Sequence, residues 1–68
     1  MAKTNKLKAL IVEQGLTQNK VAKAIGIDKT TLSRKINNST PFTIEEAKQI
    51  AKLLKMSGEQ ATEIFFDQ

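Results

Sequence analysis

Residues suited to cap helices recur at four places in this sequence, and they constrain the fold more than any other feature. Thr17, Asp28, Thr43 and Ser57 each stand where a side-chain oxygen can accept a hydrogen bond from the first turn of a helix. An apolar residue precedes the cap and another follows the first turn, a spacing that fixes the direction of the incoming chain. No stretch alternates apolar and polar residues for long enough to predict a sheet. The pattern therefore predicts an all-α protein of short helices joined by tight turns.

The sequence divides into five expected helices whose apolar residues repeat at helical spacing. They are expected over residues 5–14, 18–25, 29–36, 44–54 and 58–66. Gly15 and Gly26 follow the first two, where glycine can take the left-handed backbone that ends a helix. A chain of 68 residues predicts a single domain, over residues 1–68, with a small core. It contains no cysteine, so no disulfide supports that core.

Charge is distributed unevenly along the chain. Residues 1–40 carry eight Lys and Arg against two Asp and Glu, a net +6, whereas residues 41–68 carry three against five, a net −2. A basic half that faces a polyanion, with an acidic half behind it, suits nucleic-acid binding. Ordinary solvated surface charge gives the same signature, so charge alone leaves both interpretations open.

Several function classes are disfavoured by composition. The chain has no histidine, no cysteine and no glycine-rich phosphate loop, so we expect no enzyme, no metal site and no cofactor. The longest apolar run, residues 9–12, is far short of the roughly 20 residues that span a bilayer. The first residues lack the apolar region of a signal peptide. We therefore expect a cytoplasmic protein, associated with the nucleoid when bound to DNA, that does not act at a membrane.

Residues 18–37 form the sharpest motif, two short helices that meet at Gly26. Ala22 is small at the expected crossing, so the two backbones can approach closely. At about 100° per residue, Leu32 and Ile36 fall on one side of the second helix and point toward the core. The opposite side is polar and carries Thr30, Ser33, Arg34 and Asn37. This arrangement is typical of a helix-turn-helix, whose second helix enters the major groove of DNA.

The segment resembles the helix-turn-helix of the Cro/CI-type (XRE) repressors of phages and bacteria. The resemblance rests on Gln18, Val21-Ala22, Ile25-Gly26-Ile27, Thr31-Leu32-Ser33-Arg34 and, further on, Pro41-Phe42-Thr43. It extends over residues 5–66 and is similar above all to small repressor-like proteins of Gram-positive bacteria and their phages. It implies a compact, five-helix, lambda-repressor-like domain that binds double-stranded DNA. Asn38 departs from the pattern, because many members have glycine directly after the recognition helix.

The resemblance also implies roles for individual polar residues. The residues that match base-reading positions are Lys29, Thr30, Ser33 and Arg34. The residues expected at DNA phosphates are Gln18, Asn19, Lys35, Asn37, Asn38 and Ser39, with Thr40 in the same loop. Lys6 and Lys8 are more distant phosphate candidates. For each of them, a plain solvated surface is the alternative interpretation.

The C-terminal residues Ile64, Phe65 and Phe66 are too apolar to be fully exposed together. Consecutive phenylalanines on a helix cannot both point inward, so this end is either the edge of the core or an interface with a partner. The resemblance favours a transcriptional repressor that binds a near-palindromic operator as a homodimer. Two alternatives stay open: a modulator or antirepressor that binds a larger repressor, and an antitoxin-type autorepressor.

Overall fold

The computed structural model describes residues 4–37 and 39–66, and every regular element within them is helical. The elements are α1 (Thr4–Glu13), α2 (Gln18–Ile25), α3 (Lys29–Ile36), α4 (Ile44–Leu53), α5 (Gly58–Ala61) and a π-helical turn, η1 (Thr62–Phe66). The predicted all-α class is confirmed, and the first four helices lie within one residue of their expected bounds.

The predicted caps are present at the starts of α2, α3, α4 and α5. Each cap accepts a hydrogen bond from the backbone N–H three residues later, over 3.0–3.3 Å. At α4 the capping box is complete, because the carboxylate of Glu46 accepts from the backbone N–H of Thr43 at 2.8 Å. At α5 the Gln60 N–H donates to the hydroxyl of the predicted cap Ser57. Local hydrogen bonds thus fix where each of these helices begins.

Three helices end in the same way, with a residue in the left-handed region of the backbone. Gly15 has a φ of 73°, Gly26 a φ of 80° and Lys55 a φ of 57°. In each case the N–H of the next residue donates to a carbonyl five residues back, over 2.9–3.0 Å, as in a Schellman motif. The two glycines were predicted to end helices, whereas Lys55 takes this conformation despite its Cβ.

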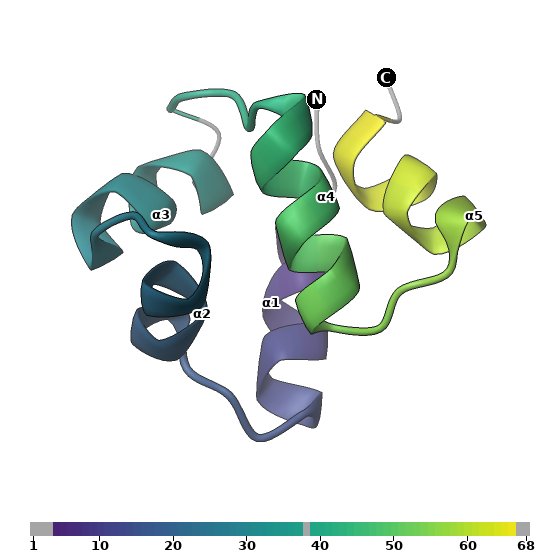
Figure 1. The fold of residues 1–68 in the computed structure, drawn as a ribbon, viewed down its shortest axis with the longest axis horizontal. Helices are drawn as coiled ribbons and strands as arrows, with labels where there is room; N and C mark the ends of the chain where they lie inside the picture. The colour runs from purple at the N-terminus through teal and green to yellow at the C-terminus, as the bar shows by residue number, and fades with distance from the viewer. Residues whose placement is uncertain (1–3, 38, 67–68) are drawn as a thin grey trace.

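The helices enclose one apolar core. In Figure 1, α2 and α3 lie on one side of α4, and α5 with η1 lies on the other. Helix α1 passes behind α4 and contacts both α3 and η1. The core contains Leu7, Ile11, Val21, Ala22, Leu32, Ile36, Ala47, Ile50, Leu54, Ile64 and Phe65. The inward orientation predicted for Leu32 and Ile36 is confirmed, because they are 0% and 1% exposed.

The C-terminal segment differs from the single α-helix expected over residues 58–66. Helix α5 ends at Ala61, and the chain continues as the wider turn of η1. A π turn rotates the chain less per residue than an α-helix does, so neighbouring side chains can share one side. Ile64 and Phe65 are both buried as a result, while Phe66 is half exposed.

Candidate nucleic-acid interface

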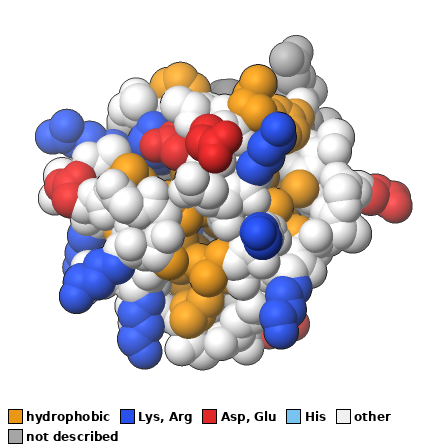
Figure 2. Space-filling model, in the orientation of Figure 1, with side chains coloured by type: hydrophobic (Ala, Val, Ile, Leu, Met, Phe, Trp, Pro, Cys, Tyr) orange, Lys and Arg blue, Asp and Glu red, His pale blue; other side chains and the backbone are white. Residues whose placement is uncertain are grey.

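Basic side chains gather in two places on the face shown in Figure 2. One group lies at the left margin, where Figure 1 places α2 and α3, and the other follows α4. The exposed lysines of this region are Lys48 and Lys52 on α4 and Lys55 just after it. The C-terminal part of the chain is therefore not a uniformly acidic surface, although its net charge is negative.

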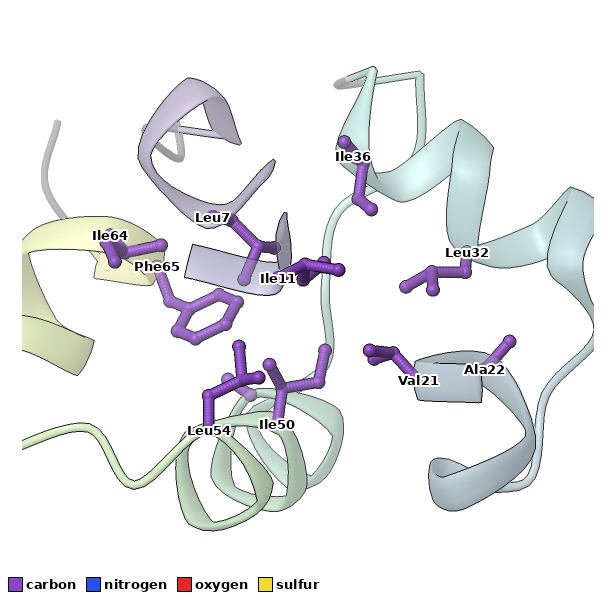
Figure 3. Close-up of a cluster of buried hydrophobic side chains, with 11 residues drawn as sticks. Leu7, Ile11, Val21, Ala22, Leu32, Ile36, Ile50, Leu54, Ile64 and Phe65 are labelled. Carbon is purple, nitrogen blue, oxygen red and sulfur yellow. The ribbon is translucent and has the colours of Figure 1, made fainter. Parts of the chain in front are cut away.

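The α2–α3 corner is held by apolar contacts on its inner side. Val21 and Ala22 of α2 are 0% and 1% exposed, and they lie next to Leu32 of α3 (Figure 3). At the turn, the Ile27 N–H donates to the Ala22 carbonyl at 3.0 Å, which closes the end of α2. Asp28 then caps α3 two residues after the left-handed Gly26. Because Leu32 packs in the core, the opposite face of α3 faces solvent.

That outer face of α3 borders an open groove of about 310 Å³. The groove is lined by Lys29, Thr30, Ser33, Arg34, Asn37 and Ser39. The structure thus brings together all four residues predicted to read bases and two of those predicted at phosphates. These side chains supply an ammonium, a guanidinium, hydroxyls and an amide, and no lining residue carries a carboxylate. The groove can therefore donate several hydrogen bonds to an electron-rich or anionic partner.

Asp28 places a negative charge at the start of α3, and its carboxylate caps that helix. Its carboxylate accepts from both the hydroxyl and the backbone N–H of Thr31. The Thr31 hydroxyl is the main cause that lowers the pKa of Asp28 below its usual 3.8. Asp28 is thus ionised at neutral pH, where its charge favours the N-terminus of α3.

The other phosphate candidates lie on two segments, the start of α2 and the loop after α3. Gln18 and Asn19 open α2, where Gln18 is half-buried and Asn19 is exposed. After α3, the Asn37 N–H donates to the Ser33 carbonyl and the Ser39 N–H to the Arg34 carbonyl, both at 2.9 Å. These two bonds hold the start of the loop against the end of α3. Asn38, also predicted at a phosphate, lies outside the described residues, and Thr40 is exposed.

Lys35 is placed differently from its prediction as a phosphate ligand. It is only 7% exposed, and its Nζ donates to Glu46 Oε1 at 2.7 Å and to the Pro41 carbonyl at 3.3 Å. Its ammonium is therefore on the inner side of α3, away from the groove. The signal was present in the sequence, because Lys35 follows Leu32 by three residues and so shares the inward face of the helix.

Glu46 holds its charge in this partly buried site because of its hydrogen bonds. Burial raises the pKa of its carboxyl group, but bonds from Lys35 and Thr43 and the charge of Lys35 lower it more. The pKa of Glu46 consequently lies below its usual 4.5. The ion pair between Glu46 and Lys35 was not predicted from the sequence.

The C-terminal candidates divide between core and surface. Ile64 and Phe65 are 1% and 9% exposed, so they belong to the core. They are therefore not exposed for the partner interface that was one of the two expectations for this end of the chain. The Phe65 ring packs edge-to-face on Phe42, with the ring centroids 5.2 Å apart. Phe66 remains available, at 50% exposed. Lys6, a distant phosphate candidate, pairs with Glu63 of η1.

Residues 4–37 and 39–66 contain neither a metal-binding cluster nor a helix that could span a membrane. No group of three or more His, Cys, Asp or Glu that could hold a metal ion occurs in this part of the chain. Nor does it contain a helix of the length and apolar character needed to cross a membrane.

Comparison with known families gives one match. The sequence model of the helix-turn-helix family matches residues 7–60, which is well over half of the chain. The match includes α2, α3 and every residue that lines the groove. No curated protein and no solved structure gives a significant match.

Proposed function

We propose, on the premise that this chain belongs to the Cro/CI-type (XRE) helix-turn-helix family of DNA-binding transcription regulators, that it is a Cro- or CI-like repressor whose α3 reads a specific DNA sequence. The observation that carries this proposal is the groove on the outer face of α3. Six polar residues line it, and four of them are those expected to read bases. A helix with this face exposed and its other face packed in the core suits insertion into the major groove.

The chemistry of the groove fits the edges of bases. The guanidinium of Arg34 can donate two hydrogen bonds to O6 and N7 of guanine, a pairing that discriminates by about 1–3 kcal/mol. Lys29 can donate to the same kind of acceptor as a point charge. Thr30 offers a methyl group to thymine and Ser33 a hydroxyl, and both sit on the same side of α3.

Two segments outside the base-reading positions of α3 are suited to contact the DNA backbone. Gln18 and Asn19 stand at the N-terminus of α2, where backbone N–H groups and the helix dipole favour a phosphate. Asn37 and Ser39 line the groove at the end of α3 and in the loop after it. Contacts from both segments would set the register of α3 on the duplex, because phosphate contacts position a protein without reading sequence.

The size of the domain supports binding as a homodimer. Its extents are 25 × 24 × 20 Å, shorter than the spacing of about 34 Å between successive major grooves on one side of DNA. One copy therefore covers one half-site, and a near-palindromic operator needs two. Phe66 and Ile44, which are 50% and 65% exposed, supply apolar surface outside the groove for the contact between copies.

The test is a selection of binding sites from random duplex DNA at two salt concentrations. We expect enriched sequences with two related half-sites about one helical turn apart, and an affinity that falls steeply as salt rises. The Arg34→Ala variant should lose the preference for guanine at one position of each half-site. Lys48→Ala removes the same charge from the exposed side of α4 and should leave the preference unchanged. A wild-type protein that bound no duplex better than random DNA at physiological salt would refute the proposal.

A second function, modulation of a larger repressor, is favoured by the exposed Phe66. An apolar side chain at the surface suits a protein interface more than a DNA contact. If this were the main function, mixing with such a repressor would give a stable heteromer by ultracentrifugation. Phe66→Ser would then dissociate the heteromer, whereas Arg34→Ala would leave it intact.

A further inference from the structure

We propose that Lys35 and Glu46 position the loop between α3 and α4 for contact with the DNA backbone, an inference that rests on the proposed function. The two residues are joined by an ion pair of 2.7 Å, and their side chains are only 8% and 16% exposed. We call this pair, with its bonds to Pro41 and Thr43, the loop clamp. Lys35 is thus a positioning residue within the recognition helix.

The clamp connects three segments through the ammonium of Lys35 and one carboxylate oxygen of Glu46. Glu46 Oε1 accepts from Lys35 Nζ at 2.7 Å and from the Thr43 N–H at 2.8 Å. Lys35 Nζ also donates to the Pro41 carbonyl at 3.3 Å. The end of α3, the loop at Pro41 and the start of α4 are therefore held by a single network.

The same loop carries two of the side chains that line the groove. Asn37 and Ser39 border it, and the Ser39 N–H donates to the Arg34 carbonyl at 2.9 Å. The loop is tied to α3 at this point and again at Pro41, through Lys35. These two ties determine how far Asn37 and Ser39 stand from a duplex in which α3 is inserted.

If Lys35 contacted a phosphate directly, replacing its partner Glu46 would change DNA binding in the opposite direction. The ammonium would have to leave Glu46, and the carboxylate would then repel the DNA. Replacing Glu46 with glutamine would strengthen DNA binding in that case, because it removes the repulsion and releases the lysine. In the clamp, the same replacement weakens binding, because it loosens the hold on the loop. The sign of this single effect separates the two roles.

The experiment measures binding of the full chain to the duplex recovered by selection, over a range of salt concentrations. The variants are Lys35→Met, which keeps an apolar stem, Glu46→Gln, which preserves a capping side chain, and the double variant. Lys48→Met is the control for the loss of one positive charge. We expect each single variant to bind about tenfold more weakly, within the range of coupling between linked groups, and the double variant to bind no more weakly than either.

The salt dependence gives an independent criterion. A lysine that neutralises one phosphate contributes about 0.9 to the slope of log affinity against log salt. Asn37 and Ser39 are neutral, so misplacing them lowers the affinity without changing the slope. An unchanged slope for Lys35→Met supports the clamp. A slope reduced by about 0.9, or tighter binding by Glu46→Gln, overturns it. Wild-type affinity in both folded variants overturns it as well.

A measurement on the DNA-free protein separates loop positioning from general stability. Hydrogen exchange of the Ser39 amide reports the loop, and that of the Leu54 amide, bonded to the Ile50 carbonyl at 2.9 Å, reports the far end of α4. We expect Lys35→Met to accelerate exchange at Ser39 much more than at Leu54. Equal acceleration at both sites would show a merely structural role and overturn the proposal. If the wild type selected no duplex, the proposed function would fail, while Ser39 exchange would still decide whether the pair holds the loop.

Discussion

The two faces of the eight-residue helix α3 have different surroundings. The outer face borders the groove with Lys29, Thr30, Ser33 and Arg34, and its polar groups are available to a partner. The inner face places Leu32, Lys35 and Ile36 in the interior, and all three are buried. The difference shows that residue type alone does not assign a role in this helix, because adjacent basic residues, Arg34 and Lys35, belong to opposite faces.

The largest effect on this comparison is expected from Leu32→Ala, on the inner face. Leu32 is fully buried, and removing a buried leucine side chain costs about 2–5 kcal/mol. A domain of this size has about 3–10 kcal/mol of stability in total, so we expect a large loss of folded protein. Urea unfolding followed by circular dichroism measures it. A loss below about 0.5 kcal/mol, the range of surface substitutions, would contradict the burial of Leu32.

The matching change on the outer face is Arg34→Ala. Arg34 is exposed and lines the groove, so its loss should leave the free energy of unfolding within about 0.5 kcal/mol of the wild type. Affinity for the selected duplex should fall by about 1–3 kcal/mol, which fluorescence anisotropy measures. A variant that lost stability instead of affinity would show that the two faces do not separate binding from folding.

Lys55→Gly, a change outside α3, tests whether stability can change while DNA binding stays the same. Lys55 holds a φ of 57°, a conformation that costs a side-chain-bearing residue about 1–2 kcal/mol. Glycine removes this strain but adds about 0.5–1 kcal/mol of chain entropy in the unfolded state. We therefore expect a net stabilisation of about 0.5–1 kcal/mol, seen as a higher Tm, with DNA affinity unchanged. A lower Tm would mean that the lysine side chain contributes more than its backbone costs.

The smallest expected effect is on the acid dependence of stability. The two residues compared are Asp28, at the start of α3, and Glu46, which pairs with Lys35 on the inner face of α3. Both have a folded pKa below the usual values of 3.8 and 4.5. Their stabilisation is therefore present above those usual values and is lost as the pH falls through the lower folded pKa values. Asp28→Asn should flatten the decline of unfolding free energy below about pH 3.8, and Glu46→Gln should do so below about pH 4.5. Both variants keep a polar cap. An unchanged decline in both variants would show that other carboxylates cause it.

Much of the fold was predictable because its signals are local. The caps at Thr17, Asp28, Thr43 and Ser57 act on groups three residues away, so short stretches of sequence contain the whole interaction. The groove was predictable for a related reason. Once Leu32 faces inward, the helical period places the base-reading candidates on the opposite side.

The features that were missed depend on groups distant in the sequence or on backbone strain. The spacing of Lys35 from Leu32 indicates its inward orientation, but no local signal indicates its partner, because Glu46 lies eleven residues away on another helix. The turn at Lys55 lacks the glycine that predicts the same motif at Gly15 and Gly26. The π turn of η1, which places Ile64 and Phe65 in the core, has no local pattern that predicts it.

The repeated start and stop signals of the helices also have a kinetic consequence. Most helix boundaries are set by hydrogen bonds that join residues three to five apart. Small helical domains rich in such local contacts fold within microseconds to milliseconds, because few long loops must close before the native contacts form. After any transient unfolding, this chain therefore regains the outer face of α3 far faster than a cell can synthesise a replacement.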